Sequence, residues 1–214
     1  MNLPVSPSTT GARKRRRKLF HKKFATHSVS FVFMLILLVS TSHWGPRSDL
    51  VAILYPLGIL LAGLAVAARL WTSVYHAGYK LHTLLTVGPY SMCRNPMYFC
   101  NCVGAVGAGL TTGMLSLTAL IVASLVLYYP FVIRREERKL LREHGKAYEA
   151  YRRRTPAFLP AWRLLDEPEE YLTNIRFFRT KIGDSMVPLV ALAAIHAIQS
   201  LHTHELLPNL LQVY

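Results

Sequence analysis

The stretch "NPMYFCNCVGAVGAGLTTGMLSLTALIVASLVLYYPFVI", residues 95–133, decides the fold, because it runs for 39 residues without an Asp, Glu, Lys or Arg. A transmembrane helix needs about 20 mostly apolar residues, so this run is long enough for two helices. The polar "LTTG" at 110–113 is a suitable turn between them. We therefore predict a helical hairpin that crosses a membrane twice.

Three further windows of the chain are free of charged side chains. The windows 24–46 and 50–68 are strongly apolar, whereas 185–204 is weaker because it carries Pro188, Gln199 and three histidines. This last window could span the membrane, lie in its interface or pack on the bundle. The fold class that we expect is all-α, a polytopic membrane helix bundle of four to five spans with a cytoplasmic helical region.

The composition agrees with a membrane protein. Hydrophobic residues make up 52% of the 214 and charged residues only 17%, where a soluble domain carries about 25%. Lys and Arg number 25 against 11 acids, a formal net charge of +14. The excess of Lys and Arg in the cytoplasmic loops of membrane proteins explains this charge, and we expect the bilayer rather than nucleic acid as the partner.

The positions of Lys and Arg predict the orientation of the spans. The basic run "RKRRRKLFHKK" at 13–23 precedes the first span, and the polar segments 69–94 and 134–181 then emerge on the same, cytoplasmic face. We expect an integral membrane protein of a bacterial inner membrane or the endoplasmic reticulum, with its N-terminus in the cytoplasm. The chain divides into a basic cytoplasmic tail at 1–23, a membrane core at 24–165 and a C-terminal extension with an apolar helix at 166–214.

Two patterns inside the apolar run have more than one interpretation. Cys93, Cys100 and Cys102 have neither the spacing nor a nearby His for a zinc site, so we interpret them as small apolar fillers of a helix and expect no metal. The glycines of "GAVGAG" at 104–109 resemble a dinucleotide-binding loop, but that motif needs a preceding strand. Close helix packing is the preferred explanation, and room for a flat ligand ring beside the helix is the alternative.

Two polar clusters flank the hairpin. "HTLLTVGPYSMCRNPMYFC", residues 82–100, gathers hydrogen-bonding groups in one connector, and Arg134 to Glu143 reads as a charged helix that leaves the membrane. Glu136 and Glu137 lie within about a turn of the membrane exit, where a carboxylate is costly unless it meets a cation or a donor. Both clusters would converge on one face and form a pocket between lipid and water.

The ordered motifs of these clusters resemble the isoprenylcysteine carboxyl methyltransferase family, which belongs to a wider group with the phospholipid methyltransferases. "HTLLTVGPYSMCRNPMY" is followed by "EERKLLREHGKAYEAYRRRTP", and "RLW" at 69–71 is similar to the lead-in of the family. The resemblance covers about residues 65–160. It implies an integral-membrane methyltransferase that takes a methyl group from S-adenosylmethionine and passes it to a lipophilic or amphiphilic acceptor, such as a prenylated substrate or a lipid.

The resemblance also implies a site at the cytoplasmic membrane boundary. The residues expected to bind the cofactor are His82, Thr83, Leu84, Leu85, Tyr90, Arg94, Asn95, Tyr98, Glu136 and Glu137. The carboxylates would offset the cationic sulfonium and ammonium groups, and Arg94 would meet the cofactor carboxylate in bidentate fashion. Asn95 stands where the family usually has a histidine; it keeps hydrogen-bonding capacity but cannot gain a proton near neutral pH.

Methyl transfer from a sulfonium is a direct displacement, so the protein must align the reacting atoms and exclude water. A carboxylate nucleophile is already ionised and needs no base, whereas an amine or thiol would need one, with His82 or Glu137 as candidates. The expected catalytic residues are Arg94, Glu137 and Arg154. The arginines expected to steer an anionic substrate are Arg134, Arg135 and Arg154.

Two alternatives stay open. Membrane sterol reductases share an ending similar to "HGKAYEAYRRRTPAFLP" and use NADPH, although they would be expected to lack the paired glutamates. A small non-catalytic membrane scaffold is the other alternative, and it would show no binding of S-adenosylhomocysteine.

Overall fold

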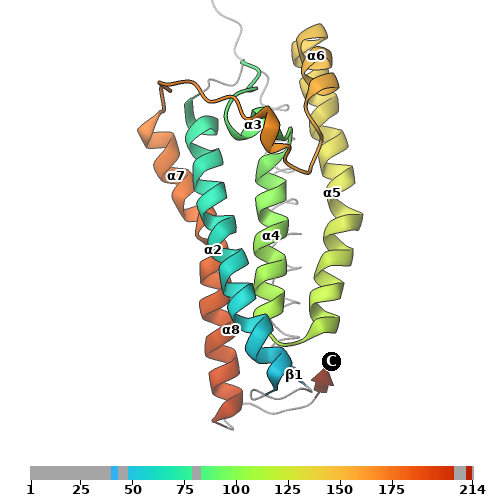
Figure 1. Cartoon of the computed structure of the whole chain (residues 1–214), viewed down its shortest axis with the longest axis vertical. Coiled ribbons are helices and arrows are strands. Elements are labelled where there is room, and N and C mark those ends of the chain that lie inside the picture. The colour runs from blue at the N-terminus through green and yellow to red at the C-terminus, as the bar shows by residue number, and fades with distance from the viewer. Residues whose placement is uncertain (1–39, 43–47, 79–82, 205–210, 214) are drawn as a thin grey trace, which may run out of the picture.

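The protein is a bundle of long helices in a computed structural model, which describes residues 40–42, 48–78, 83–204 and 211–213. Four helices carry the architecture: α2 (Asp49–Gly78), α4 (Pro96–Thr111), α5 (Leu115–His144) and α8 (Val187–Thr203). They run side by side along the long axis in Figure 1. The shorter elements are α3 (Pro89–Met92), α6 (Lys146–Arg154), the 3-10 turn η1 (Trp162–Leu164) and α7 (Ile175–Ser185).

The helical membrane bundle predicted from the sequence is confirmed. Three helical stretches of the described residues are long and apolar enough to cross a membrane, at Asp49–Ala77, Leu115–His144 and Ile175–Thr203. The predicted tail at 1–23 and most of the predicted first span at 24–46 lie outside the described residues. Within that span, Ser40–Ser42 form strand β1, which pairs in parallel with β2 (Leu211–Val213) instead of continuing a helix.

The predicted hairpin has its turn where expected, but its two arms are unequal. α4 ends at Thr111, Gly113 adopts a positive φ of 68°, and α5 begins at Leu115. α4 has only 16 residues and α5 has 30. Because about 20 residues are needed to cross the hydrocarbon core, α4 alone is short for a span, whereas α5 continues beyond it with its charged last turns.

Two expected boundaries differ from the ends of the observed helices. The span predicted at 50–68 continues as α2 to Gly78, so Arg69 lies inside a membrane-length helix and not in a polar loop. The segment 134–181, predicted to be cytoplasmic, includes the first turns of α7, which begins at Ile175 and packs against α2 as part of a stretch long enough to cross a membrane; its side of the membrane stays a prediction. In both places the helix carries a few polar residues among apolar ones, and tertiary packing decides where it ends.

Glycines set the distance between α2 and α4. A Cβ atom on Gly107 would lie 2.7 Å from the carbonyl oxygen of Gly58, and one on Gly104 would lie 3.1 Å from Pro188 of α8. Since only a bare backbone permits this approach, the glycines at 104–109 serve helix packing, which confirms the preferred interpretation of that pattern. α8 docks beside them, so the window 185–204 packs on the bundle.

The polar elements gather at one end of the bundle, which we call the site end. α3, α6, η1 and the last turns of α2 and α5 lie there, at the top of Figure 1, and the turn between α4 and α5 lies at the opposite end. The expected convergence of the two polar clusters therefore occurs.

Candidate functional site

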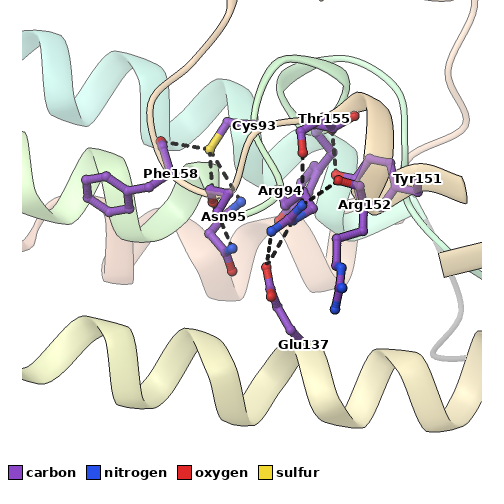
Figure 2. A network of polar contacts seen from close by, with 10 residues as sticks. Cys93, Arg94, Asn95, Glu137, Tyr151, Arg152, Thr155 and Phe158 are labelled. Carbon is purple, nitrogen blue, oxygen red and sulfur yellow. Dashed lines mark hydrogen bonds and ion pairs between the residues drawn. The ribbon is translucent and has the colours of Figure 1, made fainter. Parts of the chain in front are cut away.

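The centre of the candidate site is an ion pair between the connector and α5. Nη2 of Arg94 lies 2.8 Å from Oε1 of Glu137, and Nε of Arg94 donates to the same oxygen at 2.9 Å (Figure 2). The two side chains are only 11% and 17% exposed. An ion pair this poorly hydrated is screened less than a surface pair, so it can fix the connector against α5.

The remaining donors of Arg94 bind the end of α6. Nη1 donates to the carbonyl oxygens of Arg152 at 2.8 Å and Thr155 at 3.0 Å. A helix leaves its last carbonyl groups unpaired, and a cation there is favourable. Arg94 thus uses Nε, Nη1 and Nη2 within the protein and joins three parts of the chain. A bidentate grip on a cofactor carboxylate, as expected for this residue, would require its pair with Glu137 to open.

Glu136 points to a different neighbour from Glu137. Its Oε2 accepts a 2.8 Å hydrogen bond from the hydroxyl of Tyr98, while the residue as a whole is exposed. The Tyr98 ring lies 5.2 Å from the ring of Tyr129 on α5, centroid to centroid. The two adjacent acids therefore differ in role: Glu137 is committed to Arg94, and Glu136 is a carboxylate beside aromatic surface and solvent.

The turn before α4 is fixed by the segment that follows α6. The Asn95 amide nitrogen donates to the carbonyl oxygen of Ala157 at 2.9 Å, and Asn95 is buried. The thiol of Cys93 donates to the carbonyl oxygen of Phe158 at 2.9 Å, and burial raises the pKa of this thiol to about 11 (Figure 2). Cys100 is buried in α4 as expected of a filler. Cys93 is also buried, but it does not fill a helix as expected, because it lies in an extended turn after α3 and its thiol is hydrogen-bonded.

Two tyrosines of α6, Tyr148 and Tyr151, are buried near the ion pair. The hydroxyl of Tyr151 donates to the backbone carbonyl of Tyr90 at 2.6 Å, and burial raises the pKa of Tyr151. Burial, reinforced by the charge of nearby Glu137, raises the pKa of Tyr148 to about 12. Both phenols are therefore neutral at physiological pH, and both are almost completely buried. Their burial indicates that both tyrosines pack within the fold.

The other predicted site residues belong to the connector and to α3. Leu84 and Leu85 are half-buried in the connector, and Thr83 is exposed. Tyr90 belongs to α3, and its hydroxyl lies 3.5 Å from Nδ1 of His76. His82 lies outside the described residues.

The arginines predicted to steer the substrate are exposed to solvent. Arg134 and Arg135 are exposed on α5, and Arg154 is exposed at the end of α6. In the described part of the chain, none of these three side chains joins the ion pair of Arg94 and Glu137. Their roles stay predictions.

Residues 156–174 were not assigned to the site by the sequence, yet they bind it at several points. We call them the strap. The backbone N–H of Gly88 donates to the carbonyl of Asp166 at 2.7 Å, and the N–H of Asp166 donates to Oγ of Ser91 at 2.9 Å. Oε1 of Glu167 accepts from Nε1 of Trp71 at 2.9 Å and from the hydroxyl of Tyr75 at 2.8 Å.

The strap therefore pins both the connector and the last turns of α2. A signal for it existed in the sequence, since "DEPEE" at 166–170 is an acidic cluster in a basic chain. Nothing in its spacing indicated which residues it would meet.

The comparisons with known proteins fit this geometry. The family model described as phospholipid methyltransferase matches residues 52–147, which include most of α2 and all of the connector, α4 and α5. The nickel-cobalt-cadmium resistance protein NccN of Alcaligenes xylosoxydans xylosoxydans is 35% identical over 178 residues, which is 83% of each chain. The cobalt-zinc-cadmium resistance protein CzcN of Cupriavidus metallidurans is 41% identical over 134 residues, 63% of this chain and 62% of CzcN.

No solved structure matches the chain significantly. The family match ends early in α6, so the strap lies beyond it, while the match with NccN covers most of both chains. The chain therefore belongs to the phospholipid methyltransferase family of membrane proteins, within the wider group that its motifs indicate.

Proposed function

We propose that the protein transfers a methyl group from S-adenosylmethionine to a lipophilic or amphiphilic acceptor at the site end of the bundle. The observation that carries the proposal is the contact between Arg94 and Glu137, which joins the two polar clusters within the matched domain. The meeting of the connector with the charged end of α5 would bring polar groups to the boundary between membrane and solvent. A charged cofactor and an apolar acceptor could both reach such a position.

The residues present fit such a cofactor. The exposed carboxylate of Glu136 can offset a sulfonium or ammonium group, and the rings of Tyr98 and Tyr129 offer aromatic surface to a cation or an adenine. Leu84 and Leu85 add apolar surface on the connector. When bound, the cofactor would supply an electrophilic methyl group for direct displacement.

Within this proposal Arg94 is a positioning residue. Because its guanidinium is shared between Glu137 and the end of α6, it holds the connector and α5 at a fixed separation. Glu137 has the same positioning role. A carboxylate acceptor needs no base, whereas an amine or thiol acceptor would need one, for which Glu136 is the more accessible of the two acids. Arg134, Arg135 and Arg154 remain the proposed guides for an anionic acceptor, and the site end would face the cytoplasm.

The names of the two relatives suggest a biological process for this protein, which is resistance to metal ions. NccN and CzcN are named for resistance to nickel, cobalt, zinc and cadmium. We propose that this protein contributes to the same resistance by methylating a membrane component. The prediction is that deleting its gene lowers tolerance to cobalt, and that the wild-type protein restores tolerance while Glu137→Gln does not.

The biochemical test uses the purified full chain in detergent. Calorimetry with S-adenosylhomocysteine should show saturable binding, and NADPH should show none. Membranes incubated with methyl-labelled S-adenosylmethionine should then transfer label to a lipid, protein or volatile fraction. Binding of NADPH alone would support the reductase alternative, and binding of neither would support a scaffold; each of these results would overturn the proposal.

A further inference from the structure

A half-buried arginine, Arg69, lies on α2 about two turns before the site end of that helix. Arg69 is eight residues before Ala77, the last residue of the first membrane-length stretch, and a helical rise of 1.5 Å per residue places it about 12 Å below that end. A cation at this depth is costly, and such residues usually face the bundle interior and have a functional partner.

Arg69 lies within electrostatic range of α4 and α5. It lies close enough to Cys100 of α4 and Tyr129 of α5 for its charge to act on both. Its Nε is buried and donates no hydrogen bond to any described residue. Arg69 as a whole is half-buried, with its Nε inside the protein, so the rest of the guanidinium stays accessible to a ligand. Leaving a donor of a charged group buried and unpaired is costly, so a partner is expected.

Further polar groups surround it without supplying an acid. Oγ of Ser73, one turn along the same face of α2, is also buried and has no hydrogen-bond partner among the described residues. The side chain of Asn101 lies at the hydroxyl of Tyr129. The ion pairs of the described chain involve other residues, so Arg69 has no carboxylate partner there. The cluster is thus rich in donors and lacks an anion.

This cluster is continuous with the candidate site. The Tyr129 ring contacts Tyr98, whose hydroxyl donates to Glu136. Tyr129 and Glu136 are seven residues apart on α5, which corresponds to about 10 Å. A ligand that spans this distance could place an anionic group near Arg69 and a reacting group near Glu136.

We propose that Arg69, with Ser73, Asn101 and Tyr129, binds the anionic group of the amphiphilic acceptor, a phosphate ester or a carboxylate. A guanidinium suits this task because it pairs with such groups through two parallel hydrogen bonds. The identity of the ligand as the acceptor rests on the proposed function, whereas the anion site itself rests on the buried donors.

The test measures binding of dodecyl phosphate to the purified full chain in a non-ionic detergent by calorimetry. Wild type should bind it, Arg69→Gln should weaken the affinity about tenfold or more, and Arg69→Lys should fall between the two. The matched control is Arg163→Gln, at an exposed arginine of η1, which should bind as wild type does. Equal affinity of wild type and Arg69→Gln would overturn the proposal.

Binding of other ligands identifies the chemistry of the anionic group, and two further variants serve if Arg69→Gln does not fold. Dodecanoate in place of dodecyl phosphate separates a carboxylate from a phosphate preference, and binding of either supports the site. Inorganic phosphate should bind far more weakly, and equal binding would contradict an amphiphilic ligand. If Arg69→Gln does not fold, Ser73→Ala and Tyr129→Phe should each weaken binding of dodecyl phosphate, and unchanged affinity in both would contradict the site.

Binding of S-adenosylhomocysteine is measured on the same samples and separates the two proposals. It should be the same in wild type and Arg69→Gln. Its absence in wild type would contradict the proposed function and leave the anion site standing. Wild-type affinity of Arg69→Gln for dodecyl phosphate, with normal binding of S-adenosylhomocysteine, would contradict only the anion site.

Discussion

Replacing Glu137 with glutamine tests whether the ion pair with Arg94 fixes the connector. The substitution keeps an oxygen that can accept from Nε and Nη2 of Arg94 but removes the charge. Arg94 stays charged, so its hydrogen bonds to the glutamine oxygen remain charge-assisted, at about 1.5–3 kcal/mol each, but the Coulomb attraction to the carboxylate is lost. Since both side chains are more than four-fifths buried, we expect Glu137→Gln to lower the free energy of unfolding by about 1–2 kcal/mol.

Arg94→Ala should cost more, because it removes the donors of three hydrogen bonds together with the ion pair and leaves the Glu137 carboxylate unpaired. Truncating one partner of a buried ion pair typically costs about 3–5 kcal/mol, and partial exposure places this pair at the lower end. For a chain of this size 1 kcal/mol shifts Tm by about 2–4 °C. Thermal unfolding in detergent should therefore separate wild type, Glu137→Gln and Arg94→Ala in that order.

Glu143→Gln provides the matched control on the same helix. Its ion pair with Lys139 is 3.5 Å long, with side chains 43% and 62% exposed, and an exposed pair of this kind contributes well under about 1 kcal/mol. The double variant Arg94→Ala with Glu137→Gln should cost less than the sum of the single ones, because the pair is already broken.

The same variants report on function. If the pair positions the connector, binding of S-adenosylhomocysteine should weaken in Glu137→Gln and Arg94→Ala but not in Glu143→Gln, while all three remain folded at the assay temperature. A Tm and an affinity of Glu137→Gln that equal those of Glu143→Gln would refute the reasoning.

Three further predictions concern the surroundings of the site. Glu167→Gln should weaken cofactor binding several-fold by loosening Trp71 and Tyr75, as calorimetry can show, whereas Glu169→Gln, at an exposed neighbour, should not. Gly107→Ala should lower Tm by forcing α2 and α4 apart, because its Cβ would lie 2.7 Å from a carbonyl oxygen, whereas Gly63→Ala has open space and should leave Tm unchanged or higher. With the other cysteines replaced by alanine, the Cys93 thiol should resist alkylation at pH 8 in the folded protein and react after unfolding, since its pKa is raised to about 11.

The sequence predicted those parts of the fold that periodicity and charge control. The turn at 110–113, the exit of a charged helix at Arg134 and the meeting of the two polar clusters all follow from where apolar runs stop. The turn and the helix exit are set by neighbouring residues in the sequence. The meeting of the two clusters follows from the Lys and Arg positions, which assign both clusters to the same side of the membrane.

The parts that the sequence did not predict depend on contacts between remote segments. α2 continues past Arg69 because α7 covers its site end and the strap binds Trp71 and Tyr75 there, and no local signal marks that coverage. Arg94 binds Glu137 and two carbonyl groups at the end of α6, and the sequence does not show where α6 ends relative to Arg94. The motif around Arg94 therefore predicted a contact with a ligand instead of these contacts within the protein. Asn95 binds the carbonyl of Ala157, 62 residues away, for the same reason.

The connector and the strap form one structural unit, because backbone groups of each form hydrogen bonds with backbone groups of the other. An irregular segment must find partners for its buried N–H and C=O groups outside regular structure. The N–H groups of Gly88 and Arg94 donate to the carbonyls of Asp166 and Pro156, and the N–H of Ala161 donates to the carbonyl of Met92. The shape of the connector therefore depends on residues beyond the matched domain, and the conformation of the candidate site is a property of the chain through the strap.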